Sequence, residues 1–506
     1  MIAEGSTITS PLSVKTKVCV VGSGAGGALV AMRLAEAGHD VVVVEAGPWV
    51  QAARMNQRER DMMRLLYYES GLRTTEDGGM GVLHGRALGG STVVNYLDCF
   101  RTPDRLLDLW ENERGLPELT PAKMAPRFDR IFEILHVRKL DVSQLNANNA
   151  RLMSGANALG WKGDTFHRNA NQCYGSGFCD LGCAYNAKQS AAITFIPLAT
   201  ARGARVYTEC RVDRVTYAAG RATGVEGTCL DAERRPTVPF RVDADLVVIA
   251  GGSVETPFLL LRSGTPDPSG QIGRNLHLHP GTPVLGWFKG ERIAAYEGIK
   301  QGYYVSEFSW VLEGHETDAL IEGVGAPPGL SATAFSGFGA EFMDTLHHFN
   351  EFAVGGVLLR DNGNGRVEAG PGRPKVSYTL SPGDTKRLQR TIAASAEAYL
   401  AAGAECAITG HNPAVVVRSG KDFARIYEAP VGPNQAALFS FHQMGTARMG
   451  DRRDRDAVDP TGRVWEVANL YVADASIFPT ASGVNPQITV YALADVVADG
   501  ILAALG

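Results

Sequence analysis

The sequence predicts an α/β fold, α+β overall, in which a Rossmann-like domain is joined to a second domain built on an antiparallel sheet. Near the N-terminus, a short apolar run at 17–21, a glycine-rich turn at 22–27 and a helical pattern at 28–37 follow one another. A second buried strand at 40–45 completes a unit that implies a parallel sheet. Between about 283 and 376, short apolar runs alternate with glycine and asparagine turns, which is typical of an antiparallel sheet.

The other elements are predicted from the same kinds of pattern. Residues 382–402 have helical periodicity, with Gly383-Asp384 at the start and Gly403 at the end, which are common helix boundaries. We expect further helices at 52–72, 120–135 and 488–505, and strands at 206–217, 224–229, 241–247, 246–250, 282–288 and 353–359.

The length of the chain indicates more than one domain. Its 506 residues exceed an ordinary single domain, and a hydrophobic fraction of 45% suits a globular protein with a sizeable core. We assign residues 11–100, 190–282 and 440–506 to the Rossmann-like domain, and residues 101–189 and 283–439 to a substrate-binding or cap region.

Composition also excludes several classes of partner. A formal net charge of -5 argues against nucleic acid as the main partner, because phosphate binding needs a basic surface. No stretch reaches eighteen apolar residues, so we expect no integral membrane segment. Residues 1–15 do not resemble a secretory signal, which leads us to expect a cytoplasmic protein whose eight cysteines are mostly reduced.

The glycine-rich turn has the spacing of a dinucleotide site. Gly22 permits the tight turn, Gly24 lets the backbone approach a pyrophosphate, and Gly27 lets the helix pack closely on the strand. The backbone at Ala25 then lies at a helix N-terminus, which favours negative charge. Glu45, 23 residues after Gly22, can accept hydrogen bonds from ribose hydroxyls. The alternative is a glycine turn that binds no nucleotide.

Further motifs lie far apart along the chain. They are His84–Asn95 (HGRALGGSTVVN), Gly252–Pro257 (GSVETP), Ile272–Pro280 (IGRNLHLHP), His442–Gly450 (HQMGTARMG), Leu470–Ser476 (LYVADAS) and Gly483–Thr489 (GVNPQIT). Together with the glycine turn, they resemble the glucose–methanol–choline (GMC) oxidoreductase family, most closely the long-chain (fatty) alcohol oxidases and their bacterial relatives. The resemblance extends from Val18 to Leu505.

The resemblance implies a flavin cofactor. Some members bind FAD covalently through a histidine just before the asparagine of the second motif; here that position is Val94, so we expect non-covalent FAD. The residues implied to contact FAD are Gly22, Gly24, Ala25, Gly27, Glu45, Arg86, Gly89, Gly90, Ser91, Asn95, Val212, Asp474, Asn485 and Pro486.

The resemblance also implies a catalytic pair, His442 and Asn485. Oxidation of an alcohol removes a proton from the hydroxyl and a hydride from its carbon, and flavin N5 accepts the hydride. His442 is suited to take the proton, since histidine titrates near neutrality. Asn485 can donate to the oxygen as alkoxide character grows. The partners implied are a small-molecule alcohol and either oxygen or another electron acceptor.

Four other histidines have less specific interpretations. We expect His277 and His279 to be structural, because they lie in the loop that follows the third flavin motif. His347 and His348 lie in a predicted helix of the substrate region, where a contact with substrate is an alternative to a purely structural role.

The same region is rich in apolar side chains, some of which belong to ordinary core. They favour an aliphatic, aromatic or sterol-like alcohol over a free sugar: Phe335, Phe338, Phe342, Met343, Leu346, Phe349 and Phe352.

Cys173, Cys179 and Cys183 form a cluster with C-x5-C-x3-C spacing. Thiolates on a loop suit an iron–sulfur cluster, and the loop resembles one in some bacterial flavin dehydrogenases. It also resembles a cysteine-rich loop of fatty alcohol oxidases, for which no cluster is implied. Zinc with His167 as a fourth ligand, or a disulfide, are further alternatives. We predict that the loop holds no metal, because Ser176 replaces a cysteine found in many relatives.

The leading prediction is an FAD-dependent oxidase or dehydrogenase that acts on a primary or secondary alcohol, and three other functions compete with it. The first is an electron-transferring flavin dehydrogenase subunit that carries an iron–sulfur cluster at the cysteine loop. The second is a fatty-acid photodecarboxylase, which shares the fold but does not need His442 and Asn485. The third is a flavin-binding protein without catalysis, which the intact catalytic motifs disfavour.

Overall fold

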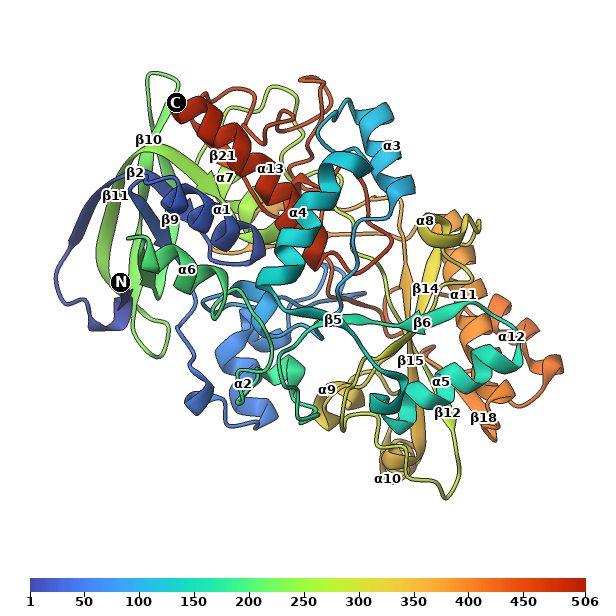
Figure 1. The fold of residues 1–506 in the computed structure, drawn as a ribbon. Helices are drawn as coiled ribbons and strands as arrows, with labels where there is room; N and C mark the ends of the chain where they lie inside the picture. The colour runs from blue at the N-terminus through green and yellow to red at the C-terminus, as the bar shows by residue number, and fades with distance from the viewer.

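The computed structural model describes residues 1–506 and contains two large sheets that lie on opposite sides of the molecule in Figure 1. The first has eight strands in the order β1-β8-β3-β2-β11-β10-β9, with β21 paired beside β11. Their bounds are β1 Ile2–Glu4, β2 Leu12–Val21, β3 Val41–Val44, β8 Arg205–Thr208, β9 Cys210–Ala218, β10 Arg221–Leu230, β11 Pro236–Ile249 and β21 Leu470–Val472.

The parallel part of this sheet is the predicted Rossmann-like unit. β2 pairs in parallel with β3 and with β11, and β11 pairs in parallel with β21. Val41–Val44 is buried throughout, which explains why the strand is apolar on both faces. β11 is longer than the other parallel strands, and on the side opposite β2 its first half pairs antiparallel with β10. The sheet therefore has a parallel and an antiparallel portion.

The second sheet is antiparallel, as the sequence predicts. Its order is β19-β18-β12-β15-β14-β13-β6, and every neighbouring pair runs antiparallel. The bounds are β6 Gly163–Thr165, β12 Pro283–Trp287, β13 Tyr303–Val305, β14 Ala319–Gly323, β15 Phe352–Leu359, β18 Cys406–Thr409 and β19 Val416–Val417. Helix α11 (Pro382–Ala401) packs on this sheet, with Tyr399 so close to the strands that a Cβ at Gly286 would lie 2.6 Å from its ring.

The helices are short apart from two. Their bounds are α1 Ala25–Glu36, α2 Glu59–Leu66, α3 Asp104–Arg114, α4 Pro121–Ile134, α5 Ala147–Ala158, α6 Phe195–Ala201, α7 Gly252–Arg262, α8 Trp310–Glu313, α9 Pro328–Ala332, α10 Gly339–His347, α11 Pro382–Ala401, α12 Ala424–Glu428 and α13 Gln487–Leu505. Three small two-stranded sheets are also present, formed by β4 (Gly81–Val82) with β20 (Phe439–Ser440), β5 (Val137–Lys139) with β7 (His167–Asn169), and β16 (Arg366–Ala369) with β17 (Pro374–Ser377).

Three predicted elements differ from the structure. The helix expected at 52–72 is only α2, because Arg58 before it and Tyr67 after it have extended backbone, with ψ of 118° and 151°. The run at 206–217 is two strands, β8 and β9, since Glu209 between them also has positive φ. The two apolar runs between 241 and 250 form one strand, β11. In the first two cases a local backbone conformation, which the apolar pattern does not show, sets the boundary.

Helix α13 is long and apolar enough to span a membrane by length and composition alone. However, 61% of its most apolar window is buried inside the protein. It packs beside α1 and α4 (Figure 1), and its Asp495 forms ion pairs with Arg33 of α1 and Arg127 of α4. A charged residue bound to two neighbouring helices is typical of a core helix.

Candidate functional site

One cavity of about 960 Å³ runs past both sheets and gathers most of the predicted site residues. Four parallel strands, β2, β3, β11 and β21, end at its edge. The segments that follow them contribute Gly22 and Gly24, Glu45, Gly251 and Asp474. Ligands of open parallel sheets bind at this carboxyl edge. The topology thus explains why residues so far apart in sequence share one wall.

The glycine turn is packed too tightly for other residues. Gly22 has a φ of 100°, and a Cβ there would lie 2.3 Å from the Ala250 carbonyl oxygen. A Cβ at Gly27 would lie 2.1 Å from the Gly22 oxygen, so this glycine serves helix–strand packing and does not line the cavity. Gly24 and Ala25 begin α1 without a side-chain cap and line the cavity. The N-terminus of α1 therefore offers its backbone N–H groups to the cavity.

The glycine turn at 22–27, Glu45, Asp474 and the loop at 84–95 form the part of the cavity that we call the cradle. Ser23 links three of these segments. Its hydroxyl donates to Glu45 Oε2 at 2.6 Å and accepts from the Gly89 N–H at 3.0 Å. Glu45 also accepts from the backbone N–H groups of Ser23 and Gly47. Burial raises the pKa of Glu45, and these hydrogen bonds oppose the rise. Glu45 lines the cavity as predicted, and it also fixes the turn, which the motif did not indicate.

Asp474 joins β21 to the start of α7. Its carboxylate accepts from the Gly252 N–H at 2.8 Å and from the Ser476 N–H at 2.7 Å, and it also accepts from the Thr256 hydroxyl. Burial raises the pKa of Asp474, and its hydrogen bonds with Ser476 and Thr256 lower it. An acidic side chain at a helix N-terminus is favourable, so Asp474 orders the second wall of the cradle.

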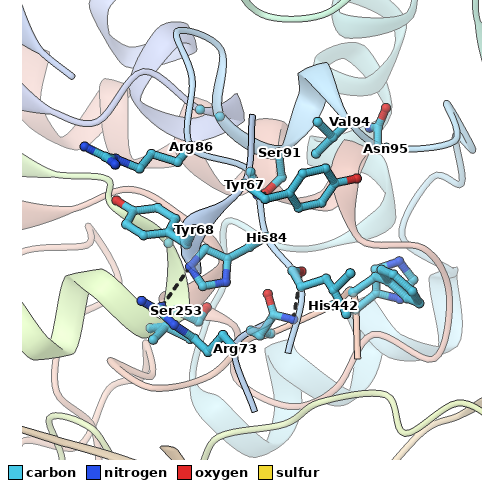
Figure 2. Close-up of a pocket in the computed structure, with 18 of the residues that line it drawn as sticks. Tyr67, Tyr68, Arg73, His84, Arg86, Ser91, Val94, Asn95, Ser253 and His442 are labelled. Carbon is cyan, nitrogen blue, oxygen red and sulfur yellow. Dashed lines mark hydrogen bonds between the residues drawn. The ribbon is translucent and has the colours of Figure 1, made fainter. Parts of the chain in front are cut away.

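The loop at 84–95 forms the facing wall of the cradle. In Figure 2, Arg86, Ser91, Val94 and Asn95 are drawn along the upper part of the pocket. Ser91 accepts from the Gly85 N–H at 2.9 Å, and Asn95 donates to Gln487 of α13. Arg86 donates to the Ala46 carbonyl at 3.1 Å.

Two glycines fix the approach of this loop to the glycine turn. A Cβ at Gly90 would lie 2.8 Å from the Gly24 Cα, so the two glycine loops nearly touch. Gly89 adopts left-handed backbone and does not itself line the cavity. Pro486 and, at the other end of the cavity, Val212 complete the predicted set.

His442 lies below these residues in Figure 2 and also lines the cavity. Burial lowers its pKa to about 4, so the ring is neutral at pH 7 and able to accept a proton. Its Nδ1 lies 3.4 Å from Nδ1 of His279, with the two rings at 88°. His279 Nε2 accepts from the Gly483 N–H at 3.1 Å. His279 therefore touches the predicted base, which the sequence did not indicate.

Asn485 follows Gly483 and is 6% exposed in the same cavity. Its Oδ1 has no hydrogen-bond partner in the protein. Its amide lies beside Glu322 of β14 and lowers the pKa of that carboxyl, against a larger rise from burial. The structure thus brings His442 and Asn485 to one cavity, together with acidic neighbours.

Several predicted contacts are absent from the cavity. His277 is buried against Asp361, with Nδ1 3.1 Å from the Asp361 carbonyl oxygen, which is the structural role expected of it. His347 and His348 do not line the cavity; His348 contacts Glu351 and Trp287 instead. Of the apolar substrate-region residues, only Phe335, Phe349 and Phe352 line it. Phe338, just before α10, is 90% exposed, and Met343 of α10 is 49% exposed; no residue of that helix is buried.

The three cysteines of the loop line a separate, small pocket with Arg168 and Lys188. All eight cysteines are free thiols. No group of three His, Cys, Asp or Glu side chains is arranged to hold a metal ion, and His167 lies against Phe132. Lys188 donates to the carbonyls of Val93, Asn95 and Cys179, so it fastens the cysteine loop to the loop at 84–95.

Comparison with known proteins identifies the family. Models of the N- and C-terminal parts of GMC oxidoreductases match residues 63–281 and 355–494, and a model of the NAD(P)-binding Rossmann-like domain matches residues 20–66. The chain is a GMC oxidoreductase. The family is FAD-dependent, in agreement with the cofactor that the sequence motifs imply.

Two curated relatives span almost the whole of this GMC oxidoreductase. An uncharacterized GMC-type oxidoreductase of Mycobacterium tuberculosis is 37% identical over 98% of the chain and 77% of the relative. Long-chain-alcohol oxidase FAO4A of Arabidopsis thaliana is 31% identical over 97% of the chain and 69% of the relative. A structure of Aspergillus oryzae RIB40 formate oxidase superposes with a TM-score of 0.71 at 18% identity, covering 98% of this chain and 99% of that one, which confirms the fold.

The cradle fits FAD by its own chemistry. The uncapped start of α1 and the neighbouring glycine backbones suit a pyrophosphate. Glu45 suits ribose hydroxyls, and the narrow gap between Gly24 and Gly90 leaves no room for side chains. The sequence missed Ser23, His279, Asp98, Gln301 and Glu322. Ser23 and His279 lie inside motifs, but neither motif assigns them a role in the site. Asp98, Gln301 and Glu322 belong to no motif, and the fold alone brings them to the cavity.

Proposed function

We propose that this GMC oxidoreductase oxidises an apolar primary or secondary alcohol to the carbonyl compound, with His442 as the base. The observation that supports this most strongly is the convergence of His442 and Asn485 on the cavity that the glycine cradle opens into. Bound FAD would supply the acceptor for the hydride that leaves the carbinol carbon.

In this proposal the neutral His442 ring takes the hydroxyl proton as the carbinol carbon loses its hydride. Burial keeps His442 neutral, which is the form that a base requires. The Asn485 amide donates a hydrogen bond to the substrate oxygen as negative charge grows on it. Proton removal by such a base contributes roughly 10²–10⁴-fold to the rate.

We infer an apolar substrate body from the far wall of the cavity. Phe335, Phe349 and Phe352 line it beside aliphatic residues of β15. A relative at 31% identity is named a long-chain-alcohol oxidase, which supports the same substrate class.

FAD is proposed to be non-covalent, because Val94 lines the cavity where a histidine would be needed for attachment. The domain boundaries and the cytoplasmic location given above also stand as proposals. The electron acceptor, oxygen or another oxidant, can be distinguished by comparing peroxide release with dye reduction on one alcohol.

The decisive experiment is anaerobic reduction of the bound flavin by a panel of alcohols, followed by visible absorbance. We expect bleaching with apolar alcohols in the wild type, a rate lower by about 10²–10⁴-fold in His442→Ala, and full FAD content in both. His39→Ala, far from the cavity, is the matched control. Unchanged bleaching in His442→Ala would overturn the assignment of the base, and faster reduction by glucose than by any apolar alcohol would overturn the substrate class.

A further inference from the structure

Three buried polar side chains beside Asn485 take no part in the FAD cradle. Asp98 is 6% exposed, and Gln301 and Glu322 are each 4% exposed, yet all three line the main cavity. They come from the segment after the 84–95 loop, from the residues before β13, and from β14 itself. The fold therefore brings three distant segments together at the end of the cavity that holds the catalytic pair.

Asp98, Glu322 and the neighbouring Asn485 each have a buried oxygen that accepts no hydrogen bond from the protein. Glu322 Oε2 accepts from Gln301 Nε2 at 2.6 Å, but Glu322 Oε1 is buried with no partner. Asp98 Oδ1 and Asn485 Oδ1 are likewise buried without a partner. Buried polar atoms in folded proteins are nearly always hydrogen-bonded. Since these residues line a cavity, a ligand in that cavity is the natural source of the missing partners.

The protonation of Glu322 and Asp98 limits which chemical groups of a ligand can bind to them. Burial raises the pKa of Glu322 to about 8, with the hydrogen bonds from Asn485 and Gln301 opposing the rise. Burial and then the charge of Glu322 raise the pKa of Asp98, while Arg168 lowers it. Glu322 is therefore mostly protonated at pH 7, and burial shifts the pKa of Asp98 in the same direction. A neutral carboxyl has one O–H donor and one carbonyl acceptor, which complements a hydroxyl group in both directions.

We propose that Asp98, Glu322 and Gln301 form a subsite for a second hydroxyl group of the substrate, on the carbon next to the reacting carbinol. Glu322 adjoins Asn485, which is the group assigned to the reacting oxygen, so the second hydroxyl must be close to the first. Beyond it, the phenylalanine-lined wall receives the apolar body. The preferred substrates are then alcohols with an apolar chain and a 1,2-diol end. This inference rests on the proposed alcohol oxidation.

The test compares 1-octanol with 1,2-octanediol in anaerobic flavin reduction and in steady-state turnover of the FAD-bound enzyme. We expect kcat/KM for the diol to exceed that for the mono-alcohol by about tenfold or more in the wild type, since a site built to bond a hydroxyl rejects the analogue that lacks it. Asp98→Asn and Glu322→Gln keep the shape of the side chain but remove its titratable O–H. Each should lower this ratio severalfold, mainly by raising KM for the diol.

The controls separate this inference from the proposed function. Asp164→Asn, an exposed carboxyl on β6, should keep the wild-type ratio, and thermal unfolding verifies that all variants are folded. If no alcohol reduces the flavin, the proposed function fails. If 1-octanol is as good a substrate as the diol, or if both variants keep the wild-type ratio, only the subsite is overturned.

Two further outcomes also overturn the subsite as a hydroxyl site. Preference for 2-amino-1-octanol over the diol would mean that ionised carboxylates bind an ammonium group. An altered flavin spectrum in Asp98→Asn, with the diol preference intact, would mean that Asp98 serves the cofactor.

Discussion

The two walls of the cavity differ in how many of their buried polar atoms find hydrogen-bond partners within the protein. On the cradle wall, Ser23, Glu45 and Asp474 have hydrogen-bond partners from the protein, and the glycines are in backbone contact. On the opposite wall, Asp98 and Glu322 have unpartnered atoms. Helix α10, which adjoins that wall, has no buried residue. The glycine turn and its two carboxylates are thus held by the protein itself, whereas Asp98 and Glu322 lack partners, as does Asn95 Oδ1 at the end of the 84–95 loop.

The largest effect is expected when a side chain is added to a glycine of the cradle, because the backbone there is in close contact. A Cβ at Gly26 would lie 1.8 Å from the Ala473 carbonyl oxygen, which is backbone and cannot move aside alone. We expect Gly26→Ala to lose about 3 kcal/mol of unfolding free energy and most of its bound FAD. Chemical denaturation and the flavin absorbance of purified protein measure the two effects.

Gly420→Ala is the control for that substitution, because a Cβ there meets nothing within 4 Å. It should stay within about 0.5 kcal/mol of the wild type. Wild-type stability with full FAD in Gly26→Ala would show that the cradle is not rigid.

A smaller effect is expected from the bridge between the two glycine loops. Ser23→Ala leaves Glu45 Oε2 without its hydroxyl donor and the Gly89 N–H without its acceptor. Loss of such buried partners costs about 1–3 kcal/mol, so FAD should dissociate about tenfold more readily. Fluorescence of released FAD during dilution measures this change. Ser143→Ala, in an exposed turn, should have no effect; equal FAD affinity in Ser23→Ala would remove Ser23 from the cradle.

The sequence predicts the cradle well because its signal is local. Gly22, Gly24 and Gly27 lie within six residues and between a strand and a helix, so a short window contains the whole turn. The helix nevertheless begins at Ala25, three residues before its apolar pattern, because the glycine backbone forms its first turn. The bridge through Ser23 was missed, since the motif leaves that position open and its partners lie 22 and 66 residues away.

The substrate wall could not be derived in the same way. The contact between His279 and His442 joins residues 163 positions apart, and Glu322 meets Gln301 through the register of β13 and β14. No periodicity in the sequence predicts such long-range contacts. Composition alone also placed Phe338 and Met343 in the substrate region, although their exposure depends on α10 lying outside the core.

The pH dependence of catalysis tests whether burial lowers the pKa of His442 in the working enzyme. Burial lowers its pKa to about 4, so the base form should persist as pH falls below the ordinary histidine range. We expect kcat/KM to stay level from pH 7 to about 5 and to fall to half near pH 4. The same shift stabilises the folded state above pH 6.5, and this contribution is lost progressively as pH falls toward 4. A midpoint near 6.5 would show that the ring is solvated in the working enzyme.

The smallest expected effect is that of Phe338→Ala, and its comparison with Phe352→Ala sharpens the contrast within the substrate wall. Phe338 is 90% exposed on the segment before α10, whereas Phe352 of β15 is 3% exposed and lines the cavity. Phe338→Ala should change the unfolding free energy by less than about 0.5 kcal/mol, while Phe352→Ala should cost about 3–5 kcal/mol. Both values come from the same chemical change, so denaturant titration of the pair isolates burial as the cause. A large loss in Phe338→Ala would place that segment against the body of the protein, and the outer wall would then be as well packed as the cradle.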